Sequence, residues 1–372
     1  MADAPPIPAP SSGRLASIDA LRGFDMFWIT GGEGIIEALN QMLHRPVTEG
    51  LARQFEHVAW QGFHFEDLIF PLFLFIVGVV LPFSVARREE TQASRRKIYG
   101  HMVRRLVVLF MLGLVVNGLL MFNFHTLRIP GVLQRIAICY FISALVMMNT
   151  GVRGQAMTAG SLLVVYWLVM RFVPVPGVGA GVFTPEGNLS AFLDQHLVPR
   201  PFCCYEFGDN EGILSTIPAI STCLIGALAG HWLRTNRPPA RKALGLALAG
   251  VAGLLLGLVW GHWFPIIKNI WTSSFVLFAA GWSLLLLALF YWIMDVRGYR
   301  RWAFFFTVIG LNSITIYVIH AVFDFGVVAR IFVRGLIRFT GPFRPLCWSL
   351  SVVAVTWLFL LFLYRRKMFL KV

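Results

Sequence analysis

Charged side chains are scarce in this sequence, and acidic ones are the scarcest. Lys, Arg, Asp and Glu make up 13% of the 372 residues, about half the share that is usual in soluble domains. Only 18 residues are acidic, whereas 57% of the chain is hydrophobic and 33 residues are phenylalanine. This composition excludes an ordinary soluble enzyme and a disordered chain. It indicates a membrane protein that crosses the bilayer many times.

Cysteines are also few. The five show no spacing typical of a metal site; they are Cys139, Cys203, Cys204, Cys223 and Cys347. Cys203 and Cys204 are adjacent, and a bridge between neighbours is strained. If their loop is extracytoplasmic, each of the two can form a disulfide with another cysteine, but we expect both to serve only as apolar side chains that fill space. Residues 1–13 lack the basic region of a signal peptide, so we expect a short disordered cytoplasmic tail, followed by one transmembrane domain over 14–372.

Long apolar runs predict an all-α fold, a polytopic bundle of about ten membrane-spanning helices. A span needs about 20 apolar residues. The expected spans are 16–36, 66–86, 106–123, 133–149, 156–174, 213–232, 243–262, 272–293, 303–325 and 346–364. Gly31, Gly32 and Gly34 predict a break in the first of them. Two connections are long enough to carry structure of their own, at 37–65 and 174–212.

The basic residues give the orientation. The net charge of +14 comes from short clusters between the apolar runs, which is typical of membrane loops and not of a nucleic-acid surface. One set of loops carries twenty Lys and Arg and the other carries eleven, so the richer set, with both termini, is expected in the cytoplasm. Four of the eleven lie between Arg330 and Arg344, which predicts an amphipathic helix on the outer surface.

Polar residues cluster where the second span begins, at the outer mouth of the bundle. His57, Glu56, Gln61 and Asp67 lie within about twelve residues, together with His64. A lone histidine is more often structural than catalytic, but acidic neighbours favour a reaction site. His57 and His64 lie seven residues apart without a helical ligand register, so we expect no metal there.

Three further polar groups face the outer side, each where a span begins. They are Arg128 to Arg135 at the fourth span, Asp209 to Gly212, with Glu211, at the sixth, and Lys268 to Trp271, with Asn269, at the eighth. Asn312 lies within the ninth span. Helix N-termini present unpaired N–H groups and a positive dipole end. Capping and interface anchoring explain each group alone. Together they predict a polar pocket on the outer face.

Several strings in this order resemble the heparan-α-glucosaminide N-acetyltransferase family over nearly the whole chain. They are RLASIDALRGFDMF, HVAWQGFHFEDLIFPLFLFIVGV, RIPGVLQR, DNEGILSTI, KNIWTSSFV and GLNSITIYVIHAVF. The resemblance implies transfer of acetyl from cytoplasmic acetyl-CoA, across the membrane, to the amine of a terminal glucosamine. It implies that His57 is the essential histidine, in a motif that includes Trp60, Gly62 and Asp67.

These patterns assign roles to the remaining candidates. We expect His57 to act as a base or as an acetyl acceptor, helped by Glu56, with Asn269 and Asn312 as oxyanion donors. Acceptor binding is expected from Trp60, Gln61, Asp67, Asp209, Glu211 and Lys268. The phosphates of acetyl-CoA are expected on a cytoplasmic ring of Arg14, Arg22, Arg87, Arg88, Arg104 and Arg105.

Two other functions stay open from the sequence. A transporter or flippase for a sugar or a cell-wall fragment would need similar polar residues in the membrane. An acyltransferase that moves another short acyl group to a cell-surface glycan would share the site and differ only in the width of its pocket. We expect a multi-pass protein of a bacterial inner membrane, in contact with the lipid bilayer and an amino-sugar acceptor, and without a nucleic-acid partner. Formation of a homodimer is left open.

Overall fold

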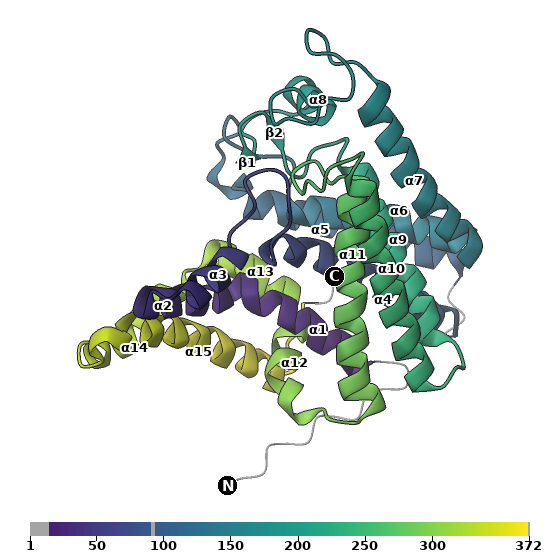
Figure 1. Ribbon diagram of the computed structural model, residues 1–372. Helices are drawn as coiled ribbons and strands as arrows, with labels where there is room; N and C mark the ends of the chain where they lie inside the picture. Colours follow the sequence, from purple (N-terminus) through teal and green to yellow (C-terminus); the bar gives the residue numbers. More distant parts are fainter. Residues whose placement is uncertain (1–14, 91–93, 371–372) are drawn as a thin grey trace. The chain divides into compact units, whose positions relative to one another are not determined.

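The computed structural model describes residues 15–90 and 94–370, and its regular structure is almost entirely α-helical (Figure 1). Arg14 and the expected tail at 1–13 lie outside the described residues. The elements are α1 (Ala16–Phe27), α2 (Glu33–Leu43), α3 (Pro46–Gln54), α4 (Glu66–Glu90), α5 (Arg95–Val116), α6 (Val132–Asn149), α7 (Val152–Phe172), α8 (Leu189–Leu197), β1 (Cys204–Tyr205), β2 (Gly208–Asp209), α9 (Thr216–Arg234), α10 (Pro239–Gly261), α11 (Ser273–Tyr291), α12 (Phe304–Leu311), α13 (Ser313–Val322), α14 (Phe325–Ile337) and α15 (Arg344–Arg365).

The expected helical membrane fold is confirmed. Among the described residues, eight helices are long and apolar enough to cross a membrane, and a ninth crossing is formed if α12 and α13, bent by 60°, count as one. These nine correspond to the second to tenth expected spans. The first expected span, 16–36, is not among them. Its helix breaks at Thr30 and at Gly31, whose φ is +125°, as the run of glycines predicted.

The third span begins earlier than expected. The sequence predicts 106–123, whereas α5 begins at Arg95, capped by Ser94, whose side chain accepts a hydrogen bond from the Lys97 N–H. It ends before Gly118, which has a φ of +98°. Long basic side chains can cover apolar surface while their charged ends stay in water. Arg104 and Arg105 therefore lie inside a helix and not in the connecting loop.

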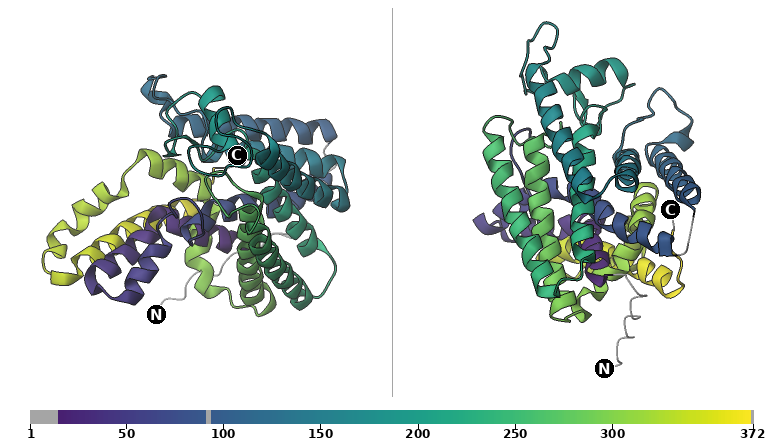
Figure 2. Two further views of the ribbon diagram at one scale, coloured as in Figure 1. Left: turned by 45° about the horizontal axis from the view of Figure 1, so that its top comes forward. Right: turned by 90° about the vertical axis from the view of Figure 1, so that its right-hand side faces the viewer.

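The described chain divides into two compact units that interleave along the sequence. Unit 1 contains residues 15–55, 237–244 and 286–370, and unit 2 contains 56–90, 94–236 and 245–285. Figure 2 shows that both consist of packed helices. The expectation of one domain over 14–372 stays a prediction.

In unit 2, α4 and α9 pack through glycines. A Cβ atom at Gly226 or Gly230 would collide with backbone carbonyl oxygens of α4, and one at Gly78 would collide with the Cys223 carbonyl of α9. Gly226 and Gly230 are four residues apart, the spacing that lets two membrane helices approach closely. This contact holds the helix that begins next to His57.

One end of the unit 2 bundle is capped by three connections that share an apolar core. The 174–215 connection carries α8 and the β1–β2 hairpin and packs with the loops around Trp60 and Phe264 (Figure 1). The buried members of this core are Tyr166, Met170, Val175, Leu189, Leu214, Phe264, Ile267 and Ile270. The cap positions the polar residues described below.

In unit 1, α1 and α12 also meet through glycines, because a Cβ at Gly23 or Gly310 would collide with backbone of the facing helix. The helix expected near Arg330–Arg344 is α14, which begins earlier, at Phe325, and ends at Ile337. It is amphipathic, as expected: Ile331, Phe332 and Leu336 are exposed, whereas Phe325 and Ala329 are buried. Its place on the outer surface of a membrane stays a prediction.

Candidate active site

His57 lies on a loop that is fixed at several points within unit 2. Gly62 has a φ of +131°, a conformation that glycine adopts without strain, and its N–H donates to the Ile266 carbonyl at 2.9 Å. Trp60 Nε1 donates to the Phe183 carbonyl at 2.7 Å, and its ring contacts that of Tyr205. The glycine and the tryptophan of the motif thus join this loop to the two neighbouring connections.

The imidazole of His57 meets a buried carboxylate. His57 Nδ1 lies 3.1 Å from Asp67 Oδ1, and Lys268 Nζ lies 3.3 Å from the same oxygen. The other oxygen, Oδ2, accepts the backbone N–H groups of His64 at 3.0 Å and Val58 at 3.5 Å. The side chain of Asp67 is 1% exposed and that of His57 is 55% exposed. A fixed anion therefore supports an accessible imidazole.

His57 Nδ1 has two polar neighbours, Asp67 Oδ1 and Lys268 Nζ, each at 3.1 Å. In one tautomer Nδ1–H donates to Asp67 Oδ1 and the lone pair of the neutral imidazole is on Nε2; in the other, Lys268 donates to Nδ1 and Nε2 carries the proton. We infer the first tautomer for the reaction, because the carboxylate can only accept a hydrogen bond. Nε2 makes no hydrogen bond within residues 15–90 and 94–370. A carboxylate that orients a histidine in this way prepares the other nitrogen to take a proton.

Lys268, which contacts both His57 and Asp67, is largely buried. Its side chain is 13% exposed. Burial lowers the pKa of Lys268 from its ordinary value, and the charge of Asp67, together with their hydrogen bond, opposes the change. Lys268 and Asp67, both expected to bind the acceptor, therefore already contact each other and His57.

Other residues expected at this site lie around it without joining the cluster. Glu56 and Gln61 are exposed, and Glu56 contributes its backbone carbonyl, which accepts from His64 Nδ1 at 2.8 Å. Asn269 is half-buried beside Lys268. The structure brings Asp67, rather than Glu56, to the imidazole. The assigned roles of Glu56, Gln61 and Asn269 stay predictions.

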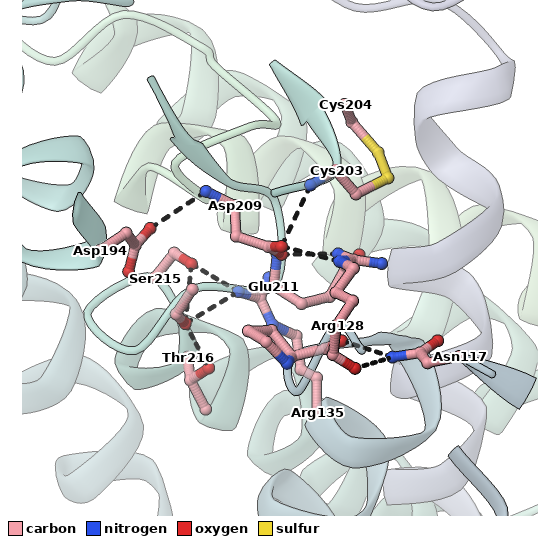
Figure 3. Close-up of polar contacts among 12 residues, drawn as sticks. Asn117, Arg128, Arg135, Asp194, Cys203, Cys204, Asp209, Glu211, Ser215 and Thr216 are labelled. Carbon is pink, nitrogen blue, oxygen red and sulfur yellow. Dashed lines mark hydrogen bonds and ion pairs between the residues drawn. A yellow bond between two sulfur atoms is a disulfide. The ribbon is translucent and has the colours of Figure 1, made fainter. Parts of the chain in front are cut away.

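Asp209 and Glu211 form an ion-pair network with Arg128 (Figure 3). Arg128 Nε lies 2.7 Å from Asp209 Oδ2, and its Nη2 contacts both Asp209 and Glu211. Burial disfavours the charge of Arg128, but the two carboxylates raise its pKa above the ordinary value. Asp209 is fully buried and also accepts the N–H groups of Cys203 and Glu211. Its observed contacts fix the hairpin to the loop before α6.

The sequence did not single out Asp194, which contacts Asp209 of this network. Its two carboxylate oxygens accept the backbone N–H groups of Asp209 and Ile213, each at 3.2 Å. Burial raises the pKa of Asp194 to about 6, although both N–H groups favour the ionised form. An acidic residue in the middle of the apolar helix α8 was the available signal.

Arg135 belongs to the polar group that begins the fourth expected span. It is 1% exposed inside the bundle, donates to Ser215 Oγ and to the Gly212 carbonyl, and lies 4.9 Å from the ring centre of Trp271. Its Nε and Nη1 atoms have no hydrogen-bond partner in the described chain. Interface anchoring was one explanation for a cation at this position, and the burial of Arg135 does not fit it, because an anchor keeps its charged end at the membrane surface.

The structure corrects our expectation for two cysteines. Cys203 and Cys204 are not filler; they form a disulfide with each other at the β1 end of the hairpin (Figure 3). Neighbouring cysteines can be bridged when the local backbone turns, and Cys204 has a φ of +79°. Cys139 and Cys223 are buried free thiols.

The arginines expected to bind acetyl-CoA are distributed over both units. Arg88, Arg104 and Arg105 of unit 2 lie near one another around His101, and the Arg105 guanidinium lies 4.3 Å from the ring centre of Tyr140. Arg87 is exposed nearby in sequence on α4, and Arg22 belongs to α1 of unit 1. Arg14 lies outside the described residues. Within the described chain the buried Arg105 Nε has no hydrogen-bond partner, which suits a phosphate oxygen, and the binding of acetyl-CoA by these arginines stays a prediction.

Asn312 is in unit 1, at the break between α12 and α13. It is 1% exposed, and neither its Oδ1 nor its Nδ2 has a partner within the described chain. A buried amide without partners suits a polar ligand group. Among described residues, no group of three His, Cys, Asp or Glu side chains is placed to hold a metal ion.

The fold and this site together define a polytopic helical membrane protein with a carboxylate-supported histidine at the capped end of its bundle. The chain belongs to the heparan-alpha-glucosaminide N-acetyltransferase family, because the model of that family's catalytic region matches residues 14–259. This confirms the resemblance seen in the sequence.

Two relatives are similar along most of the chain. Heparan-alpha-glucosaminide N-acetyltransferase of Mus musculus is 26% identical over 370 residues, which cover 84% of this chain and 54% of the relative. The Homo sapiens protein of the same name is 25% identical over 429 residues, which cover 96% of this chain and 60% of the relative. The chain therefore spans between about half and three fifths of the length of these relatives.

Proposed function

We propose that the chain is a transmembrane N-acetyltransferase. It moves an acetyl group from cytoplasmic acetyl-CoA to the amine of glucosamine or a related amino sugar on the other side of the membrane. The observation that carries this proposal is the hydrogen bond between His57 Nδ1 and the buried Asp67, in a chain of this family. It leaves Nε2 free for the proton that an attacking amine must lose.

In the direct route, the sugar amine attacks the acetyl carbonyl while His57 Nε2 accepts the amine proton. A C–N bond forms and the C–S bond of the thioester breaks. The CoA sulfur leaves as the thiolate and takes the proton back from His57. Asp67 stabilises the imidazolium that exists between these two proton transfers.

In the covalent route, Nε2 attacks the thioester first and carries the acetyl group. The C–S bond breaks and CoA leaves as the thiolate. The sugar amine then attacks the acetyl carbon, the bond from that carbon to Nε2 breaks, and the proton lost by the amine passes to the thiolate. Asp67 supports this route equally, because it keeps the Nε2 lone pair exposed. Asn269 and the unpaired N–H groups of Arg135 are candidates to stabilise the oxyanion.

The experiment is transfer of radiolabelled acetyl from acetyl-CoA by the purified full chain, scored against a panel of amino sugars. The proposal expects N-acetylated sugar with the wild type and at least about 100-fold slower transfer with His57→Ala. Labelled His57 in the absence of sugar identifies the covalent route. A carrier without chemistry would yield no acetylated sugar at all, and that result would contradict the proposal.

A further inference from the structure

A cavity of about 820 Å³ lies within unit 1, among α2, α14 and α15. Its size falls within the range of about 300–1,000 Å³ that is typical of small-molecule sites. The charged and polar side chains that line it are Glu37, Gln41, Arg330, Arg334, Arg344 and Ser349, and the aromatic ring of Trp348 also lines it. Nothing in the proposed acetyl transfer uses these residues.

The charge of the cavity is unbalanced. Arg330, Arg334 and Arg344 line it, and none of them forms an ion pair within residues 15–90 and 94–370. Glu37 is the acidic residue of the lining, and it accepts a hydrogen bond from Gln41 at 3.2 Å. The formal charge of the lining is therefore positive. Three guanidinium groups around one space are suited to phosphate, which they bind through several parallel hydrogen bonds.

The apolar face of α14 indicates where that phosphate comes from. Ile331 is 75% exposed and Phe339, just after the helix, is 89% exposed. Arg330 and Arg334 line the cavity from the same helix. A helix with an exposed apolar face and a basic face is typical of the plane between lipid headgroups and acyl chains.

Trp348 and Arg344 place the cavity at the end of a membrane span. Both are on the first turns of α15, which is long and apolar enough to cross a membrane. Tryptophan and arginine are typical of the level of the headgroups. The Arg330 guanidinium lies 5.8 Å from the centre of the Trp348 ring, so the aromatic wall and the basic wall adjoin.

We propose that this cavity binds the phosphate headgroup of an anionic phospholipid, with the exposed apolar face of α14 beside the lipid chains. The arginines bind the phosphate, and the lipid acts as a structural ligand of α2, α14 and α15. The inference is independent of acetyl transfer, because it rests on other residues.

The test is binding of phosphatidylglycerol to the purified full chain in neutral detergent, followed by native mass spectrometry. A basic residue near anionic lipid contributes about fivefold in affinity. The triple variant R330Q/R334Q/R344Q should therefore bind at least about tenfold more weakly. The matched control is Arg338→Gln, an exposed arginine just after α14 that does not line the cavity. It should bind like the wild type.

A second variant predicts a gain, which a damaged fold would not give. Glu37→Gln removes the opposing carboxylate and should tighten binding by about fivefold. If the triple variant does not fold, the single arginine variants are compared with Arg338→Gln instead, with about fivefold expected for each. Equal losses in a cavity variant and in Arg338→Gln would overturn the proposal.

The source of the phosphate is tested with three further probes. Phosphatidylcholine, inorganic phosphate and a sulfated disaccharide should each bind more weakly than phosphatidylglycerol. Equal binding of phosphatidylcholine would overturn the need for net negative charge, and equal binding of inorganic phosphate would overturn the lipid. Tighter binding of the disaccharide would instead make the cavity a glycan site.

Discussion

At the scale of the residue, His57 exposes more than half of its side chain, yet one of its ring nitrogens is held by a fully buried carboxylate. An exposed side chain contributes little to packing, whereas a free Nε2 is needed for proton transfer. His57→Ala should therefore lower acetyl transfer by at least about 100-fold and leave CoA binding and the melting temperature nearly unchanged. Radiolabel transfer and thermal unfolding measure both. His262→Ala, at an exposed histidine on the loop after α10, is the control and should transfer at the wild-type rate.

Asp67 is expected to act through His57. Asp67→Asn retains the size of the side chain. Its amide N–H, facing Nδ1, favours the wrong tautomer, and its neutral oxygen, facing Nδ1, no longer supplies the charge that stabilises the imidazolium. The kcat should fall by about 100-fold to 10,000-fold with a smaller change in KM, and the alkaline rise of the pH–rate profile should move or disappear. A purely structural role for Asp67 would instead lower the amount of folded protein and leave the pH profile of the remaining activity unchanged.

Part of this site was predictable from the sequence, and the missing part has a physical reason. The motif around His57 identified the histidine and its acidic surroundings. It did not identify which acid contacts the imidazole. Glu56 is the neighbour in sequence, whereas Asp67 contacts His57 because the loop between them folds back on itself. That closure depends on the conformation of Gly62 and on a hydrogen bond to Ile266, a residue of a distant connection. Contacts between distant segments leave no periodic signal.

At the scale of the element, the contact between α4 and α9 is set by residues without side chains. Gly226→Leu would force the helices apart, because its side chain would enter the space of α4 backbone. The melting temperature should fall, with a loss of at least about 1–3 kcal/mol. Gly160→Leu on α7, where no atom lies within 4 Å of the new Cβ, is the matched control. A similar fall for both variants would show that hydrophobic bulk, and not helix contact, is responsible.

The cap over unit 2 should be sensitive to pH through Asp194. Its folded-state pKa, about 6, is above the ordinary value of 3.8, so protonation favours the folded state. The resulting stabilisation is complete below the ordinary pKa and is lost as the pH rises through about 6. The free energy of unfolding should thus be about 1–1.5 kcal/mol higher at pH 5 than at pH 7.5 from this residue. Thermal unfolding of Asp194→Asn should show a smaller difference between the two pH values, and an unchanged difference would contradict the assignment.

Helix existence was more predictable than helix boundaries. Apolar runs identified the spans from the second to the tenth, because burial in lipid requires about 20 apolar residues. The start of α5 was missed, since Arg104 and Arg105 resemble loop residues in composition although they lie near the middle of the helix, where long basic side chains can cover apolar surface while their charged ends reach water. The disulfide between Cys203 and Cys204 was missed because a strained local geometry was expected to prevent it.

At the scale of the whole molecule, the proposed reaction needs an anion site at the end of the bundle opposite the cap. Within unit 2, His57 precedes the start of α4, and Arg88 lies in the last turn of α4. Arg104 and Arg105, near the middle of α5, lie close to Arg88 around His101. The long α4 therefore separates the histidine from this basic cluster. Acetyl-CoA suits such a separation, because its phosphates and its thioester lie at opposite ends of a long molecule.

Charge reversal tests this division of roles. The double variant R104E/R105E should bind CoA at least about tenfold more weakly, because two attractive charges become repulsive near the phosphates. Added salt should weaken CoA binding to the wild type and have less effect on the variant, since salt screens exposed charges. Arg153→Glu, an exposed arginine at the start of α7, is the control for charge alone on the expected cytoplasmic side. Isothermal titration in detergent measures CoA binding to all three proteins.

If the double variant and the control lose affinity equally, the arginines act through net charge and do not form the CoA site. If the double variant alone loses affinity while a saturating acetyl-CoA concentration restores its transfer rate, the basic end binds the donor and His57 performs the chemistry.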